Sequence, residues 1–96
     1  MVGLLADIDK RVSAEFKQAG DIVVLIGQSR EELGGSYAHF ILTGRDEGEV
    51  PEIDLKEARR LNDLLVEAAA RSLPASAHDC SEGGLAVALV ECSLGG

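Results

Sequence analysis

Aromatic and basic residues are scarce in this sequence. Only three aromatic side chains occur among 96 residues and tryptophan is absent, so the core must be aliphatic and the stacking platforms that bind single-stranded nucleic acid are missing. Nine lysines and arginines stand against 17 aspartates and glutamates, which gives a net charge of −8. Because no basic stripe exists, we expect neither nucleic acid nor an anionic membrane as a partner.

Long apolar runs and cysteine motifs are also lacking. The longest apolar run is far below the about 20 residues that span a bilayer, and acidic residues soon interrupt the apolar N-terminus, unlike in a signal peptide. Cys80 and Cys92 have neither a CxxC spacing nor a histidine cluster around them, which disfavours a zinc site. Two cysteines without a disulfide framework favour a reduced, cytoplasmic setting.

The apolar pattern that remains predicts a layered α/β (α+β) fold, with helices packed on a mixed, aliphatic sheet. Residues 22–26 are five consecutive apolar residues in a glycine-bounded segment, as in a strand covered on both faces. Residues 2–8 and 11–16 predict a strand pair, and residues 75–80 predict a strand edge. The C-terminal helix leaves part of such a sheet unaccounted for, so residues 1–96 are expected to form an incomplete domain of a larger polypeptide.

Capping residues and apolar spacing predict the helices. They are a single turn from Ser29 to Gly34, a short helix from Ser36 to Gly44, a long helix from Asp54 to Pro74, and a last helix from Gly83 to Cys92. In the last two helices, apolar residues recur every three or four positions, so each helix should bury one face. The acidic stretch 44–53, broken by glycine and proline, is expected to be a solvated loop without chemistry.

The most distinctive stretch runs from Ser76 to Leu85 and places Gly83 and Gly84 where the last helix should begin. Glycine inside a helix is less favourable than alanine by about 1 kcal/mol, so a pair needs a reason. The first N–H groups of a helix have no intrahelical partner and carry the positive end of its dipole. When no side chains cover them, these groups make a seat for a phosphate.

A structural explanation of the same stretch competes with the phosphate site. Asp79 and Glu82 have the spacing of a capping box, which would close the helix start with its own side chains and leave the glycines for close packing. The two carboxylates would also repel a bare phosphate. An anion at this position would therefore arrive with Mg²⁺, which prefers oxygen ligands.

No catalytic residue is assigned from the sequence. His78 beside Cys80 and Ser81 suggests an activated nucleophile, but neighbouring residues of an extended segment point to opposite faces and no third orienting group is identifiable. A second glycine pair, Gly34 and Gly35 before Ser36, also precedes a predicted helix. By itself that pattern is more often a turn than a ligand loop.

Three segments resemble the synthetase subunit of the phosphoribosylformylglycinamidine (FGAM) synthase family, in its small bacterial and archaeal form. They are residues 20–27 (GDIVVLIG), 32–36 (ELGGS) and 76–89 (SAHDCSEGGLAVAL), in matching order and separation. The last block is typical of the wider aminoimidazole-ribonucleotide-synthetase (AIR-synthase)-like superfamily. The resemblance covers nearly the whole chain and places it in the first part of the second C-terminal-type domain.

The resemblance implies a ligase that uses ATP and Mg²⁺ to convert formylglycinamide ribonucleotide and ammonia from glutamine into formylglycinamidine ribonucleotide in purine biosynthesis. Its partners would be the other domains of the parent chain, a glutaminase and small accessory subunits, and the chain alone should be inactive. The positions that it implies near a substrate or phosphate are Gly34, Gly35, Ser36, Asp79, Ser81, Gly83 and Gly84. The catalytic histidine and the main ATP and Mg²⁺ ligands of the family fall outside this chain.

Two departures from the family pattern and two alternatives stay open. Tyr37 directly follows Ser36, where the family has Glu-Tyr, and Cys80 replaces a valine. Another enzyme of the AIR-synthase superfamily, such as aminoimidazole ribonucleotide synthetase, selenophosphate synthetase or a hydrogenase-maturation protein, would share the last block. A non-catalytic interaction domain could keep the fold without a ligand. Self-association is also expected, because the predicted sheet has an exposed edge.

Overall fold

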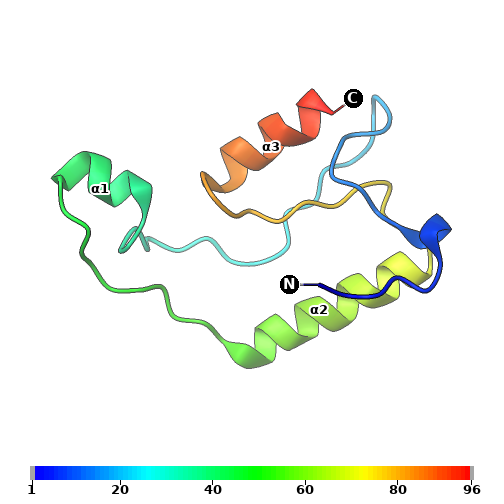
Figure 1. Ribbon diagram of the computed structural model, residues 1–96, viewed down its shortest axis with the longest axis horizontal. Helices are drawn as coiled ribbons and strands as arrows, with labels where there is room; N and C mark the ends of the chain where they lie inside the picture. The colour runs from blue at the N-terminus through cyan, green and yellow to red at the C-terminus, as the bar shows by residue number, and fades with distance from the viewer. Residues whose placement is uncertain (1, 96) are drawn as a thin grey trace.

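The computed structural model describes residues 2–95, which contain helices and no strand. The elements are a 3₁₀ helix η1 (Ile8–Lys10) and the α-helices α1 (Tyr37–Thr43), α2 (Leu55–Ala70) and α3 (Gly84–Leu94). Long irregular segments connect them, and the three α-helices lie well apart (Figure 1). No two helices of the described chain form an extended packed interface.

The expected α/β fold with helices on a mixed sheet is therefore wrong. A strand exists only where its backbone pairs with a neighbour, and residues 22–26, the expected central strand, form no such ladder in the described part of the chain. Their side chains are correspondingly exposed, from 48% for Ile26 to 89% for Ile22. The apolar run reflects a preference for a covered surface, but no segment of residues 2–95 covers it.

The other predicted strands, residues 2–8, 11–16 and 75–80, are also wrong. The Asp7 side chain accepts a hydrogen bond from the Asp9 N–H and starts η1, so this region turns as a 3₁₀ helix and forms no hairpin. Residues 75–80 have no regular secondary structure, and only one backbone hydrogen bond joins them to the N-terminal region, from the Ala77 N–H to the Ser13 carbonyl at 3.0 Å. One bond does not make a ladder.

Helix starts with a side-chain cap agree with the prediction. Ser36 caps α1 by accepting from the His39 N–H, and Gly44 ends it in the left-handed conformation with φ of 71°. Asp54 caps α2 by accepting from two amides of the first turn. The single helical turn predicted after Ser29 is wrong, because residues 29–33 are irregular. An isolated turn fixes several residues for one hydrogen bond and needs tertiary support.

The buried core is very small. Within the described residues, the buried apolar side chains are Ala88 and Cys92, each 7% exposed, and both lie on the predicted inner face of α3. Leu85 and Leu89 share that face but remain partly exposed. In the predicted buried stripe of α2, Ala58, Leu61, Ala68 and Ala69 are only half-buried. The predicted inward face of this helix is therefore confirmed, and its predicted full burial is wrong.

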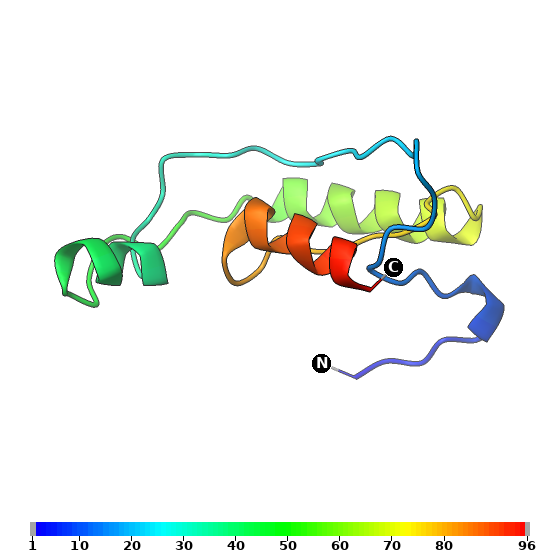
Figure 2. The same cartoon turned by 90° about the horizontal axis from the view of Figure 1, so that it is seen from above.

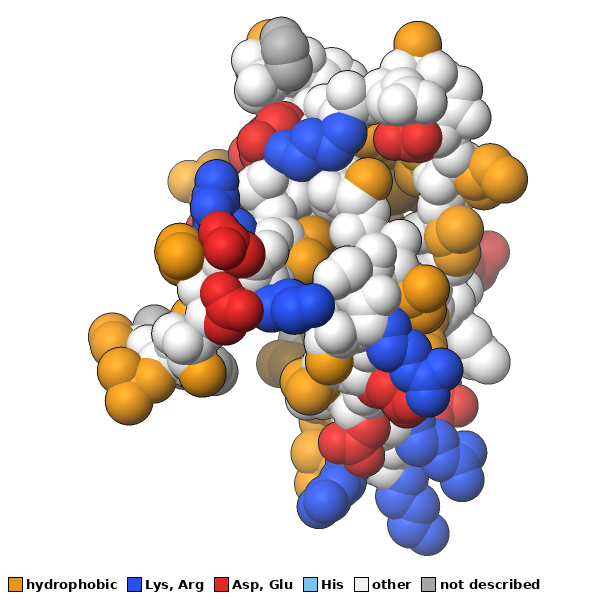
Figure 3. Space-filling view, turned by 90° about the vertical axis from the view of Figure 1, so that its right-hand side faces the viewer, with side chains coloured by type: hydrophobic (Ala, Val, Ile, Leu, Met, Phe, Trp, Pro, Cys, Tyr) orange, Lys and Arg blue, Asp and Glu red, His pale blue; other side chains and the backbone are white. Residues whose placement is uncertain are grey.

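The molecule is open. Its accessible surface is 8668 Å², whereas a compact protein of this mass exposes about 5,300 Å². The radius of gyration is 15.9 Å, against about 12.5 Å for a compact domain of this length. Seen from above, α1 stands to one side of the other helices (Figure 2), and apolar side chains are scattered among the charges on the surface (Figure 3). No described helix has the length and apolarity to cross a membrane.

Candidate functional site

The first turn of α3 begins with glycines and has no side-chain cap. Gly83 is the N-cap residue, and no side chain caps the helix by a hydrogen bond. The Gly84 N–H donates to the Ser81 carbonyl at 3.2 Å. The capping box considered for Asp79 and Glu82 does not form in the described chain. The remaining amides of this first turn therefore keep the polarity that suits an anion.

Glycine at position 83 is required by two features of this turn. Its φ of +80° lies in the left-handed region, which is unfavourable for residues with a Cβ atom. A Cβ atom there would also stand 2.3 Å from Val87 Cγ2 and 2.8 Å from Val87 Cβ. The absence of a side chain thus lets the backbone approach the helix, and it leaves the amides uncovered.

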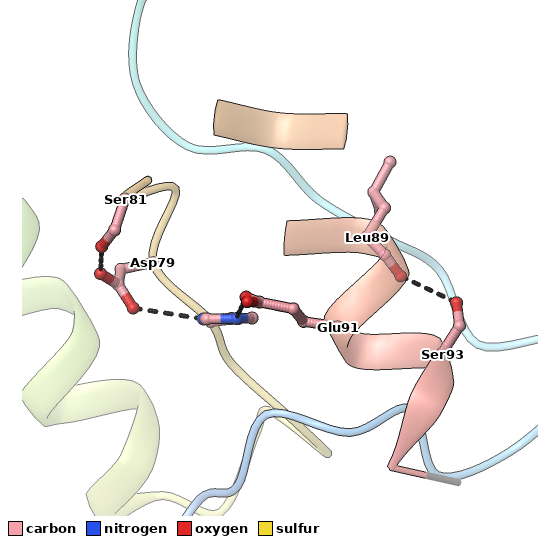
Figure 4. A network of polar contacts seen from close by, with 6 residues as sticks. Asp79, Ser81, Leu89, Glu91 and Ser93 are labelled. Carbon is pink, nitrogen blue, oxygen red and sulfur yellow. Dashed lines mark hydrogen bonds and ion pairs between the residues drawn. The ribbon is translucent and has the colours of Figure 1, made fainter. Parts of the chain in front are cut away.

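Next to this turn, four polar side chains form a chain of contacts (Figure 4). The His78 ring lies between two carboxylates, with Nε2 2.7 Å from Glu91 Oε2 and Nδ1 3.2 Å from Asp79 Oδ1. The second carboxylate oxygen of Asp79 accepts a hydrogen bond from the Ser81 hydroxyl. Glu91 belongs to α3, whereas the other three belong to the segment that enters the turn. The contacts therefore join the segment to the helix.

The charges in this cluster shift two pKa values. The hydrogen bond with Glu91 is the main cause that raises the pKa of His78 above its usual 6.5, and contact with Asp79 adds to it. The hydrogen bond from Ser81 is the main cause that lowers the pKa of Asp79, followed by a backbone hydrogen bond and by His78. Since both ring nitrogens of His78 face acceptor oxygens, the ring carries both protons when both contacts are made.

Replacing Glu91 by Gln should lower the pKa of His78 toward 6.5, because a neutral amide stabilises the imidazolium less than a carboxylate does. With its pKa raised by folding, His78 stabilises the folded chain fully below pH 6.5, and this stabilisation disappears as the pH rises through the folded pKa. NMR titration of labelled histidine in dilute samples of the chain measures the shift. Glu67→Gln, in the α2 ion pair with Arg71, is the control and should leave the titration unchanged.

The first glycine pair is closed by a neighbouring loop. A Cβ atom on Gly34 would lie 2.0 Å from the Glu49 carbonyl oxygen, so the backbone at residues 47–49 passes directly over this turn. The Gly35 N–H donates to the Glu47 carbonyl at 3.3 Å, and the Ser36 N–H donates to the Leu33 carbonyl at 3.1 Å. The chain thus satisfies these amides itself, and the loop expected to be merely solvated supports the turn.

The two glycine turns belong to facing helix starts. In both Figure 1 and Figure 2, the start of α1 and the start of α3 point toward the same space. No hydrogen bond joins the two turns in the part of the chain that the structure describes. The structure therefore brings Asp79, Ser81, Gly83 and Gly84 together in one turn, and keeps Gly34, Gly35 and Ser36 as a separate turn across from it.

Residues 2–95 offer no group of three or more His, Cys, Asp or Glu side chains that could hold a metal ion. Of the two carboxylates considered for Mg²⁺, Asp79 already uses both oxygens for contacts with His78 and Ser81. These residues do not fit a Mg²⁺ site by themselves.

An open groove of about 680 Å³ lies between residues 26–32 and the first turns of α2. Arg30, Arg60 and Glu52 are among its lining residues, and no motif in the sequence predicts this groove. The described residues that line it include none of the seven positions implied near a substrate or phosphate. The groove and the glycine turns are therefore separate features.

Comparison with known proteins gives one family and a consistent set of relatives. Residues 18–96 match the family described as AIR synthase related protein, C-terminal domain. The chain is 44% identical over 96 residues to phosphoribosylformylglycinamidine synthase subunit PurL from Alkaliphilus metalliredigens (strain QYMF), covering all of this chain and 13% of the relative. The corresponding subunit from Moorella thermoacetica (strain ATCC 39073 / JCM 9320) is 45% identical with the same coverage.

The subunit of the same name from Anaeromyxobacter sp. (strain Fw109-5) is 44% identical over 94 residues, which are 98% of this chain and 12% of the relative. The chain thus spans about one eighth of the length of the curated relatives that it matches. No solved structure matches it.

Proposed function

Because the chain belongs to the AIR synthase related protein family, with residues 18–96 in its C-terminal domain, we propose that it is a segment of an ATP-dependent ligase of purine biosynthesis. The whole protein would join ammonia, released from glutamine, to formylglycinamide ribonucleotide and form formylglycinamidine ribonucleotide. The proposal is supported by relatives named as phosphoribosylformylglycinamidine synthase subunits, which align along the entire chain.

Within this ligase, the start of α3 would bind a phosphate group of the nucleotide or ribonucleotide. The observation that carries this assignment is the first turn of α3. No side chain caps this helix by a hydrogen bond, and Gly83 has no side chain that would cover the backbone. Its amides would donate to phosphate oxygens, and the positive end of the helix dipole would favour the charge. Asp79 and Ser81 would shape the entrance to this turn.

The turn at Gly34, Gly35 and Ser36 would line the opposite side of the same space. Its amides are largely satisfied by the chain, so its contribution would be close approach of bare backbone to a ligand, with few direct hydrogen bonds. The facing positions of the two helix starts support this arrangement (Figure 1).

In the proposed reaction, ATP transfers a phosphoryl group to the formamide oxygen of the substrate. Ammonia then attacks the formamide carbon and displaces phosphate from it, with loss of a proton. This chain would hold and orient phosphate, and it offers no metal cluster within the described residues. Phosphoryl transfer needs converging metal ligands and cationic groups. Mg²⁺ ligands and catalytic groups would therefore come from other domains of the parent protein.

Those other domains would also cover the apolar surface of this chain. Many large apolar side chains are exposed, and the total accessible surface is far above the value for a compact protein of this size; both support a large contact area with the other domains. We propose the rest of the parent polypeptide as the main partner, with a glutaminase and small accessory subunits in the assembled enzyme, in the cytoplasm.

Asp79→Ala in the full-length protein should raise the dissociation constant for Mg-ATP about tenfold, because the turn loses a charge-assisted hydrogen bond to Ser81 and its contact with His78. Isothermal titration calorimetry measures the change, and Glu67→Gln on the exposed face of α2 is the matched loss of one carboxylate. Equal affinities in all three proteins would contradict the phosphate site and favour a non-catalytic interaction domain.

A further inference from the structure

Residues 22–26 have unpaired backbone groups and exposed apolar side chains. None of their backbone N–H or C=O groups makes a hydrogen bond to another backbone group within the part of the chain that the structure describes. Their side chains are 48–89% exposed, and the segment follows an open course beside α2 (Figure 2). Unpaired backbone groups that carry β-branched apolar side chains are available for pairing with another chain.

The charge pattern makes a second copy of this chain a suitable partner for this segment. Asp21 is the only charged residue from 20 to 29, although the whole chain carries −8, so the repulsion between two copies is weakest here. Gly20 and Gly27 bound the run with φ of 97° and 124°, outside the β region, so a ladder would end at both glycines. Each copy therefore offers the same short, uncharged segment, as a two-fold symmetric contact requires.

The position of Asp21 favours one direction of pairing. In a parallel, in-register pair the two Asp21 side chains would stand next to each other, and like charges at such positions are destabilising. In an antiparallel pair centred on Val24, Asp21 of each copy lies opposite Gly27 of the other, and Ile22 lies opposite Ile26. The antiparallel pair therefore separates the two carboxylates and keeps the apolar residues in contact.

The groove beside this run offers the pair further apolar contact. Two paired strands alone are marginally stable in water. Ile26 lines the groove of about 680 Å³ together with Ala58, Leu61 and Leu64 of α2. Apolar side chains that arrive with a second copy can be buried against this part of α2, which stabilises the pair.

We propose that residues 22–26 of two copies of this chain pair antiparallel about Val24 and form a two-fold symmetric contact. The proposal concerns the 96-residue chain by itself, without the other domains of the proposed ligase, and it does not rest on the phosphate site. The backbone of each run supplies the hydrogen-bonding groups that the other run lacks within its own chain.

Cysteine cross-linking of the 96-residue chain tests this register. In a Cys80→Ser background, which removes the exposed native thiol, Val24→Cys should form a disulfide-linked dimer about tenfold faster than Val50→Cys, an exposed position in another segment. Directly opposite residues of an antiparallel pair have Cα atoms about 4.5–5.5 Å apart, within the range that a disulfide spans. Copper–phenanthroline serves as the oxidant, and non-reducing electrophoresis measures the dimer.

Two further positions distinguish the antiparallel register from other arrangements. Two copies of residue 22 would lie about 14 Å apart in this register, so Ile22→Cys and Ile26→Cys should each cross-link slowly alone and rapidly when mixed. Rapid cross-linking of Ile22→Cys alone would indicate a parallel pair, and equal rates at all positions would indicate association without a register. Either result overturns the proposal, as does a rate for Val24→Cys no higher than that for Val50→Cys. Circular dichroism identifies any variant that loses its helices. If Val24→Cys is such a variant, the mixture of Ile22→Cys and Ile26→Cys decides the test.

Discussion

Gly83→Ala is expected to weaken Mg-ATP binding by the full-length protein about a hundredfold. A non-glycine residue in the left-handed conformation costs about 1–2 kcal/mol, and overpacking against Val87 adds about 1–3 kcal/mol. Relief of this strain must move the start of α3, whose amides form the proposed site. A total of about 3 kcal/mol corresponds to about two powers of ten in affinity, measurable by calorimetry.

Two other glycines provide graded controls for this substitution. Gly84 has φ of +65° and Gly20 has φ of +97°, and a Cβ atom on either would meet no atom within 4 Å. Gly84→Ala strains the same turn without a clash, so its loss of affinity should be smaller than that of Gly83→Ala. Gly20→Ala strains a distant turn and should lower stability while leaving affinity unchanged. Equal losses for Gly83 and Gly20 would show that the effect is general destabilisation.

The isolated 96-residue chain is expected to self-associate strongly. The described residues form no sheet and therefore no sheet edge, but their exposed apolar side chains support the expected association. In sedimentation velocity the chain should form dimers and larger species as concentration rises. Added salt should increase association, because it screens the repulsion between chains that each carry a charge of −8.

A matched pair of lysine substitutions locates the associating surface. Val24 lies within the exposed run 22–26, and Val50 is an exposed apolar residue in the acidic loop 44–53. Both substitutions change the charge equally, but only Val24→Lys interrupts a continuous apolar run. Val24→Lys should therefore reduce association more than Val50→Lys. A monomer at high concentration and high salt would contradict the expectation.

Helices α1 and α2 were predictable because local chemistry decides where they begin. Ser36 and Asp54 cap helix starts through hydrogen bonds to amides two or three residues away, and Gly44 ends α1 with a conformation that suits glycine. Such contacts span a few residues, so the spacing of residues in the sequence contains them.

Strands were not predictable in the same way, because a strand depends on a partner. Residues 22–26 have the composition of a buried strand, yet composition does not supply a neighbouring backbone. The same limit applies to burial. The apolar stripe of α2 was correctly placed on one face, but its exposure depends on what packs there, and no described element packs closely against it.

At the candidate site, the sequence indicated the glycine turn and missed the contacts that support it. The uncovered helix start at Gly83 was predictable because glycine is the one residue type without a side chain. The pairing of His78 with Glu91 and the approach of Glu49 to Gly34 join residues from different elements. In the sequence, the only signal for the first pairing was a histidine beside a possible cap and a glutamate on the following helix.

Residues 13–16 connect the N-terminal region with two segments that lie far along the chain. The Ser13 carbonyl accepts from the Ala77 N–H, and the Phe16 N–H donates to the Cys92 carbonyl, so one short N-terminal segment holds both the approach to α3 and its last turn. Closing loops of this length costs more entropy than forming a local helix. The capped starts of α1 and α2 depend on neighbouring residues alone, whereas we expect the turn at Gly83 to reach its final geometry only when Cys92 is available to pair with Phe16.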